Sequence, residues 1–138
     1  MERNMHALFA AAFAYIFSQP MIRQNPDLLW PTLFFSLLAG IFPDFDLNMG
    51  HRKLLHNIIV LAITSYLISR YDVYLAQIWL VAYGSHLILD MLTPAGVALF
   101  GVGPRVRFPL HPVLRYIFIF GFLVIMLVIY AGILPRNV

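Results

Sequence analysis

The feature that most constrains this chain is a long apolar run near its C-terminus, LRYIFIFGFLVIMLVIYAGIL, which carries no charge beyond Arg115. A segment that spans a bilayer as a helix needs about 20 apolar residues. Four other apolar stretches precede this run, over residues 5–19, 28–42, 54–69 and 73–93. With only 11% charged residues, a soluble domain would have too little charge to cover its surface. The sequence therefore predicts an all-α, polytopic membrane helix bundle that forms one domain over residues 1–138.

The lengths of these stretches leave the number of transmembrane helices at four to five. The first three contain about 15–16 residues each, or about 22–24 Å of helix, whereas a hydrocarbon core is about 30 Å thick. Such helices must borrow polar flanks, thin the bilayer or be partly re-entrant. Gln19-Pro20 and Asn25-Pro26 are expected to end the first helix, and residues 94–112, rich in Pro and Gly, to form a loop.

The cations indicate an orientation in the inner membrane. If there are five spans, six of the nine Lys and Arg residues fall on one face, which the positive-inside rule makes the cytoplasmic one. The first stretch is expected to be a retained helix rather than a signal peptide, because Glu2 and Arg3 nearly cancel in charge. The net charge of +3 is explained by these loop cations, so the expected partner is the lipid bilayer and not nucleic acid. The predicted cytoplasmic face carries Arg3, Arg52, Lys53, Arg105, Arg107 and Arg115, and the other face carries Arg23, Arg70 and Arg136.

Seven His and Asp residues fall on this same predicted face. His86 and Asp90 are four residues apart, so their side chains share one helix face inside an apolar stretch, where ionisable groups are functional by default. Two further carboxylates flank Phe45, a spacing that lets them reach one ion or bridge two. The seven candidate metal ligands are His6, Asp44, Asp46, His51, His56, His86 and Asp90.

The chain has no cysteine, so a metal site must use imidazole and oxygen ligands. Several imidazoles with several carboxylates suit zinc, manganese or iron, and we expect zinc first. Metal ions in such a site lower the pKa of a bound water and hold a phosphoryl oxygen. A site of this kind hydrolyses esters without a covalent nucleophile. Taken singly, the same residues have simpler interpretations: a surface histidine at position 6, a solvated loop around Asp44 and Asp46, and a structural hydrogen bond between His86 and Asp90.

Other polar residues near these ligands have less specific roles. Arg52 and Lys53 are most simply determinants of topology, and Arg52 is alternatively a partner for a substrate phosphate. Arg105 and Arg107 are further candidates to hold an anionic headgroup. Asp46 or Asp90 is expected to act as general base if it is not itself a ligand. His111 is expected to be a loop histidine without a ligand role.

Four motifs resemble one known family. PDFD at 43–46, HRKLLH at 51–56, YGSHLILDMLTPAGV at 83–97 and RVRFPL at 105–110 are similar to the YdjM family of LexA-regulated inner-membrane, metal-dependent hydrolases. The resemblance implies that the seven residues are its metal-site positions. The block around His86 and Asp90 is also distantly similar to the zinc-dependent phospholipase C and single-strand nuclease superfamily, which favours phosphoester chemistry. The chain departs from the family where HRGxTH becomes HRKLLH, and where a Trp-Pro after PAGV becomes FGVGP.

Three function classes follow from these observations. The first is a membrane-bound metal-dependent hydrolase acting on an ester, most specifically a phosphoester, of a lipid or membrane-proximal substrate. The second is a divalent-metal transporter, which would place its ligands near the bilayer midplane and not at one face. The third is a non-catalytic membrane protein in which the metal joins helices.

Overall fold

The computed structural model describes residues 3–49 and 54–130, and this part of the chain is helical. An isolated antiparallel bridge joins Val97 to Val106, and no longer strand occurs among the described residues. The all-α prediction is therefore confirmed. The helices are α1 (Arg3–Gln24), η1 (Pro26–Leu28), α2 (Leu29–Ile41), η2 (Phe42–Met49), α3 (Ile58–Ser69), α4 (Val73–Met91) and α5 (Pro112–Tyr130), where η marks a 3-10 helix.

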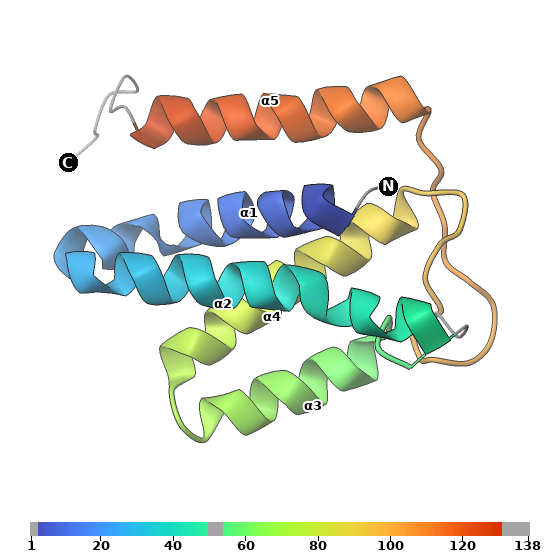
Figure 1. The fold of residues 1–138 in the computed structure, drawn as a ribbon, viewed down its shortest axis with the longest axis horizontal. Helices are drawn as coiled ribbons and strands as arrows, with labels where there is room; N and C mark the ends of the chain where they lie inside the picture. The colour runs from blue at the N-terminus through green and yellow to red at the C-terminus, as the bar shows by residue number, and fades with distance from the viewer. Residues whose placement is uncertain (1–2, 50–53, 131–138) are drawn as a thin grey trace.

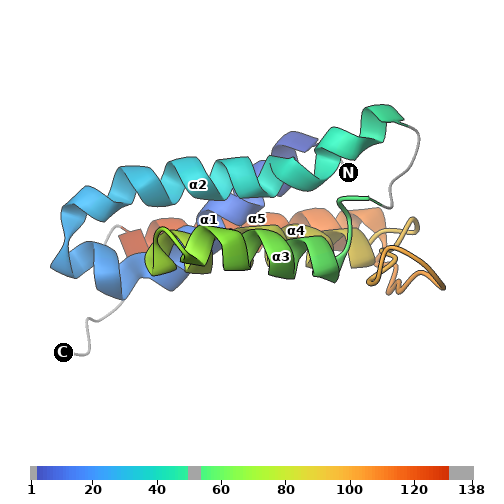
Figure 2. The ribbon, with the colours of Figure 1, turned by 90° about the horizontal axis from the view of Figure 1, so that it is seen from below.

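Successive α-helices run in alternating directions along one axis. In Figure 1, α1, α3 and α5 begin at the end of the bundle where α2 and α4 finish. Helix α4 is the central element, because it contacts α1, α2 and α3, whereas α5 lies against α1 on the outside (Figures 1 and 2). Sequence segments far apart, such as the first turn of α1 and the last turn of α4, therefore meet at one end.

Small residues allow α1 to pack closely against its neighbours. Ala10 and Ala14 of α1 and Ala39 of α2 are fully buried in a core that also contains Trp79 and Tyr83 of α4. Alanine side chains let helix backbones approach, which is the usual way in which helices associate inside a membrane. The polar ends of α1, α2 and α4 are thereby brought within side-chain reach of one another.

One predicted boundary is wrong. Helix α1 does not stop at Gln19-Pro20 but continues through Pro20 to Gln24, for 22 residues or about 33 Å. A proline removes one backbone hydrogen bond and kinks a helix, and neighbouring helices in a membrane bundle tolerate this loss. The chain turns instead at Asn25, whose side chain accepts a hydrogen bond from the backbone N–H of Asp27 (3.2 Å).

The described residues support membrane association. Two segments, Met5–Gln24 and Pro26–Phe45, are long and apolar enough to cross a bilayer, judged by length and composition. Several bulky apolar side chains point outward, among them Trp30, Phe34 and Phe120, which are 76%, 65% and 70% exposed. A soluble monomer rarely exposes so many large apolar side chains. The count of four to five spans stays a prediction.

Candidate metal centre

Five of the seven predicted ligands come together at the end of the bundle where α1 begins. His6 lies in the first turn of α1, Asp44 follows α2 in η2, and His56 precedes α3 by two residues. His86 and Asp90 lie in the last turns of α4. The alternating helix directions bring these four segments together although 84 residues separate His6 from Asp90.

The ring nitrogens and carboxylate oxygens form a closed cycle. His56 Nε2 lies 3.5 Å from Asp44 Oδ1 and 3.3 Å from Asp90 Oδ2. His86 Nε2 lies 3.6 Å from the same Asp44 oxygen and 3.4 Å from the same Asp90 oxygen. Ligand atoms of His56, His86 and Asp90 lie within 4.8 Å of one another, as do those of His6, Asp44 and His86.

These four separations fit a metal better than they fit hydrogen bonds. A charge-assisted N–H···O bond has its heavy atoms about 2.7–2.9 Å apart. With metal–ligand bonds of about 2.0–2.2 Å, neighbouring ligand atoms around an octahedral or tetrahedral ion lie about 2.8–3.6 Å apart. All four distances in the cycle, from 3.3 to 3.6 Å, fall in the second range and outside the first.

The hydrogen bond on the far side of the His86 ring fixes its tautomer. His86 Nδ1 lies 2.7 Å from the carbonyl oxygen of Gly40, and a carbonyl can only accept, so Nδ1 carries the proton. In the neutral imidazole, Nε2 then presents a lone pair. This nitrogen is buried and has no hydrogen-bond partner among the described residues. It faces oxygens of Asp44 and Asp90, which are acceptors too, and a cation between these atoms relieves that conflict.

The buried negative charge of the two carboxylates also favours a bound cation. Asp44 is 8% exposed, Asp90 is 20% exposed, and His6, His56 and His86 are almost completely buried. Two carboxylates in such a place are costly unless they are paired with cations or coordinate a metal. The donor set of carboxylate oxygens and imidazole nitrogens therefore fits a divalent ion.

His6 lies beside the cycle of His56, His86, Asp44 and Asp90 and contacts two of its members. Its Nε2 lies 3.0 Å from Asp90 Oδ1, the oxygen that does not take part in the cycle, and its ring centroid lies 4.3 Å from that of His86, with the two rings tilted by 32°. In this arrangement His6 donates to Asp90 and orients it, as partners of metal-bound carboxylates commonly do. Asp90 is the most exposed of the five, so the side of the cluster next to it is where water or a substrate can enter.

Local hydrogen bonds place His56. The Asn57 side chain caps α3 by accepting from Val60 N (2.9 Å), and it donates to the Leu54 carbonyl (2.7 Å). The Tyr83 hydroxyl donates to the Leu55 carbonyl, which ties this segment to α4. Leu55, which stands where HRGxTH has Thr, therefore contributes a backbone carbonyl, and Asn57 contributes a helix cap.

The basic run after α4 folds back onto the site. Phe108 N donates to the carbonyl of Met91 (2.7 Å), the residue after Asp90. Arg105 and Arg107 donate to carbonyls of Ala95 and Pro94 in the same loop, at 3.2 and 3.5 Å. RVRFPL is therefore positioned beside the end of α4 by backbone contacts.

Gly40 is a residue of the site that sequence reasoning missed. Besides its carbonyl bond to His86, its backbone lies so close to α1 that a Cβ added there would be 2.7 Å from Ala10 Cβ and 3.1 Å from Ala7 Cα. The signal in the sequence was a glycine near the end of an apolar helix, which is common wherever membrane helices cross closely.

The remaining predicted residues are not all testable against the structure. His51, Arg52 and Lys53 lie outside the described residues, and so does the side chain of Asp46. His111 is exposed just before α5, away from the burial seen for the five clustered residues. The interpretation of His86 and Asp90 as a simple pair is incomplete, since His86 Nε2 lies 3.4 Å from Asp90 Oδ2 and also 3.6 Å from Asp44 Oδ1.

Comparison with known proteins identifies a family for this chain. A family model described as YdjM inner membrane protein matches residues 1–137, which include every residue of the cluster. No curated protein and no solved structure matches the chain. The match confirms the resemblance to YdjM, while the hydrolase activity and the distant likeness to zinc-dependent phospholipase C stay predictions.

Proposed function

We propose, from the premise that this chain belongs to the YdjM inner membrane protein family, that it is a metal-dependent hydrolase of the inner membrane. Its substrate would be an ester, and more narrowly a phosphoester, of a lipid or membrane-proximal molecule. One observation carries the proposal. The buried Nε2 of His86 has no hydrogen-bond partner among the described residues and faces two carboxylate oxygens at 3.4 and 3.6 Å, separations that suit a cation held between the three atoms.

Zinc is the ion we propose, with manganese and iron as alternatives. Imidazole and carboxylate ligands without thiolates suit all three, whereas magnesium rarely recruits several imidazoles. His56, His86, Asp44 and Asp90 would hold the ion, with His6 orienting Asp90. Asp46 and His51 are additional proposed ligands from the sequence.

In the proposed ester hydrolysis, different residues of the chain have different roles. A divalent ion bound here would acidify a water and polarise a phosphoryl oxygen. Asp90 reaches the exposed side of the cluster, where it can accept a proton from an attacking water, and the His6 hydrogen bond holds it in place. Asp46 is the other candidate for this role. Arg52, Arg105 and Arg107 are proposed to steady the anionic part of the substrate.

We further propose that the chain crosses the membrane four to five times, with the cluster at the cytoplasmic face. The helices alternate in direction, and the cluster lies where α1 and α3 begin and α4 ends (Figure 1). Arg105 and Arg107 lie at that end, whereas Arg23 and Arg70 lie at the other, as expected for an excess of cations inside.

A structural metal is the second candidate, and burial favours it. Four of the five clustered side chains are at most 8% exposed, as in closed sites that join secondary-structure elements. Both candidate functions require a bound metal, but only the hydrolase is expected to turn over a substrate.

The experiment therefore measures metal content and hydrolysis on the same protein. Purified full-length chain is analysed for bound elements, and is then assayed with zinc or manganese against bis-nitrophenyl phosphate and phospholipids. Asp44→Asn should abolish both metal binding and turnover without unfolding the protein. Asp72→Asn is the matched control, because Asp72 caps α4 at the far end of the bundle and asparagine caps equally well. Bound metal with no turnover across a broad ester panel would favour the structural role.

A further inference from the structure

The seam between α1 and α5 leads away from the metal centre. Phe9 of α1 and Ile119 of α5 are buried together with Leu89 of α4, one residue before Asp90. Farther along, the Phe122 ring lies 4.9 Å from that of Phe9 in a tilted contact and stacks on that of Phe13 at 5.4 Å, measured between ring centroids. Because both helices begin at the same end of the bundle, the seam starts at that end and runs along the outside of α1 (Figure 1).

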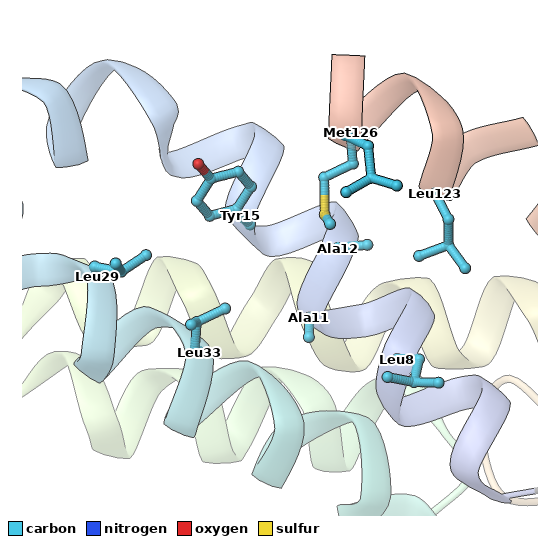
Figure 3. A pocket seen from close by; sticks show the side chains of 9 residues that line it. Leu8, Ala11, Ala12, Tyr15, Leu29, Leu33, Leu123 and Met126 are labelled. Atoms are coloured by element: carbon cyan, nitrogen blue, oxygen red, sulfur yellow. The ribbon is translucent and has the colours of Figure 1, made fainter. Parts of the chain in front are cut away.

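Apolar hollows flank this seam. One, of about 370 Å³, is lined by α1, α2 and α5, and Figure 3 shows Leu123 and Met126 of α5 on one side, Leu29 and Leu33 of α2 on the other, and α1 between them. A second, of about 360 Å³, is lined only by Met5 of α1 and residues of α5 that again include Leu123. Both volumes fall within the range of about 300–1,000 Å³ that is usual for small-molecule pockets. The second hollow begins at Met5, the residue before His6.

A basic side chain, Arg115, lies at the end of the seam where α1 and α5 begin. Arg115 is in the first turn of α5, one helical turn before Ile119 and on the same helix face, which packs against α1. Its Nε is buried and has no hydrogen-bond partner among the described residues. Arg105 and Arg107, in contrast, already donate to loop carbonyls. Arg115 therefore has a buried, unpaired Nε, and it lies at the end of the seam where α1 and α5 both begin (Figure 1).

We propose that a glycerophospholipid is the substrate of this site, with its acyl chains along the α1–α5 seam and its phosphate held by Arg115 at the metal centre. The inference rests on the proposed hydrolase function and names its substrate. Charge complementarity selects the occupant, because an apolar hollow alone accepts any lipid whereas an unpaired guanidinium requires an anion. A bidentate arginine–phosphate contact would orient the phosphoester toward His86 and Asp90.

The test is photolabelling of the full-length chain in maltoside micelles, which contain no phosphate to compete with the probe, with chelator present so that no probe is consumed. The probe is a phosphatidic acid with a diazirine in its acyl chain, and a diacylglycerol with the same diazirine is the comparison. Peptides containing Leu8, Ala12 or Leu123 should be labelled preferentially by the phosphatidic acid. Arg115→Gln should lower this labelling about tenfold, the effect of losing one charged hydrogen bond, and Arg23→Gln at the far end should not.

A second variant keeps the proposal testable if Arg115→Gln does not fold. Ala11→Phe fills the larger hollow and should also prevent labelling, whereas Ile63→Phe on the exposed face of α3 should not. Equal labelling by the two probes, or equal labelling of α3 and the seam, would overturn the inference. Selective labelling without hydrolysis would disprove the proposed function and leave a phospholipid site. Hydrolysis of bis-nitrophenyl phosphate without selective labelling would disprove this inference alone.

Discussion

Substituting Gly40 with alanine should weaken metal binding although no ligand is touched. The added Cβ would lie 2.7 Å from Ala10 Cβ, whereas carbon atoms in contact lie about 3.5–4.0 Å apart. Helices α1 and α2 must therefore separate by roughly 1 Å, at a cost of about 1–3 kcal/mol for overpacking. Both contacting atoms belong to short, fully buried side chains or backbone, so no rotamer change relieves the clash.

The same displacement moves the site. Gly40 holds the ring of His86 through its carbonyl, and the added Cβ would also lie 3.4 Å from the carbonyl oxygen of His6. Metal–ligand distances tolerate about 0.2 Å, so a shift of roughly 1 Å should lower metal affinity by about 10- to 100-fold. Affinity is measured by competition with a chelator for the detergent-solubilised protein, and stability by thermal unfolding of the metal-free form.

Matched variants separate this explanation from a general intolerance of alanine. Gly84→Ala on α4 meets only Leu61, at 3.9 Å, and Gly121→Ala on α5 meets nothing within 4 Å, so both should bind metal normally. Adding Ala10→Gly to Gly40→Ala removes the contacting Cβ and should restore most of the lost affinity. If Gly40→Ala binds metal as tightly as the native chain, or if Ala10→Gly fails to rescue it, the link between helix approach and the site is refuted.

Three other substitutions test the placement of individual side chains. His86→Ala should lower metal affinity at least 100-fold by removing a central ligand, whereas His111→Ala should leave it unchanged, as a chelator titration would show. Asn57→Ala removes the cap of α3 and should lower the free energy of unfolding by about 1 kcal/mol, measured by denaturant titration. Tyr83→Phe releases the Leu55 carbonyl and should cost about 1–3 kcal/mol of stability, with weaker metal binding if His56 moves with that segment.

The alternation of apolar stretches was enough to predict the helices and the end at which the ligands meet. In an up-and-down bundle, two positions lie at the same end when an even number of helices separates them and at opposite ends when that number is odd. Counting the predicted helices therefore places His6, Asp44 and His86 at one end. The i, i+4 spacing likewise put His86 and Asp90 on one face, because the helix repeat is local. These inferences need only the order of elements along the chain.

Sequence reasoning failed where the outcome depends on contacts between helices. Pro20 has a strong local tendency to end a helix, yet the bundle continues α1 past it, because packing outweighs one lost backbone bond. The role of Gly40 depends on how closely α1 approaches α2, a distance that no local pattern encodes. Arg115 looked like a cation that only sets topology, and its position against α1 depends on the register of two helices more than a hundred residues apart in the chain.

The last prediction concerns the side of the membrane on which the cluster lies, and cysteine labelling can test it. It contains no cysteine, so any introduced cysteine is a unique label site. Tyr71, in the turn between α3 and α4, is 94% exposed, and Val102, in the loop beside the cluster, is 76% exposed. If the cluster faces the cytoplasm, an impermeant maleimide should label Tyr71→Cys but not Val102→Cys in spheroplasts, and the reverse in inside-out vesicles.

The physical reason for this expectation is the distribution of cations, since Arg105 and Arg107 accompany Val102 whereas Arg70 is the neighbour of Tyr71. The opposite labelling pattern would place the cluster outside the cytoplasm and would disprove the proposed orientation without affecting the metal site. Labelling of both cysteines from the same side would show that α4, which separates the two positions, does not cross the membrane. The bundle would then lie with its exposed apolar surface in one leaflet, and the cluster would meet lipid headgroups from the side.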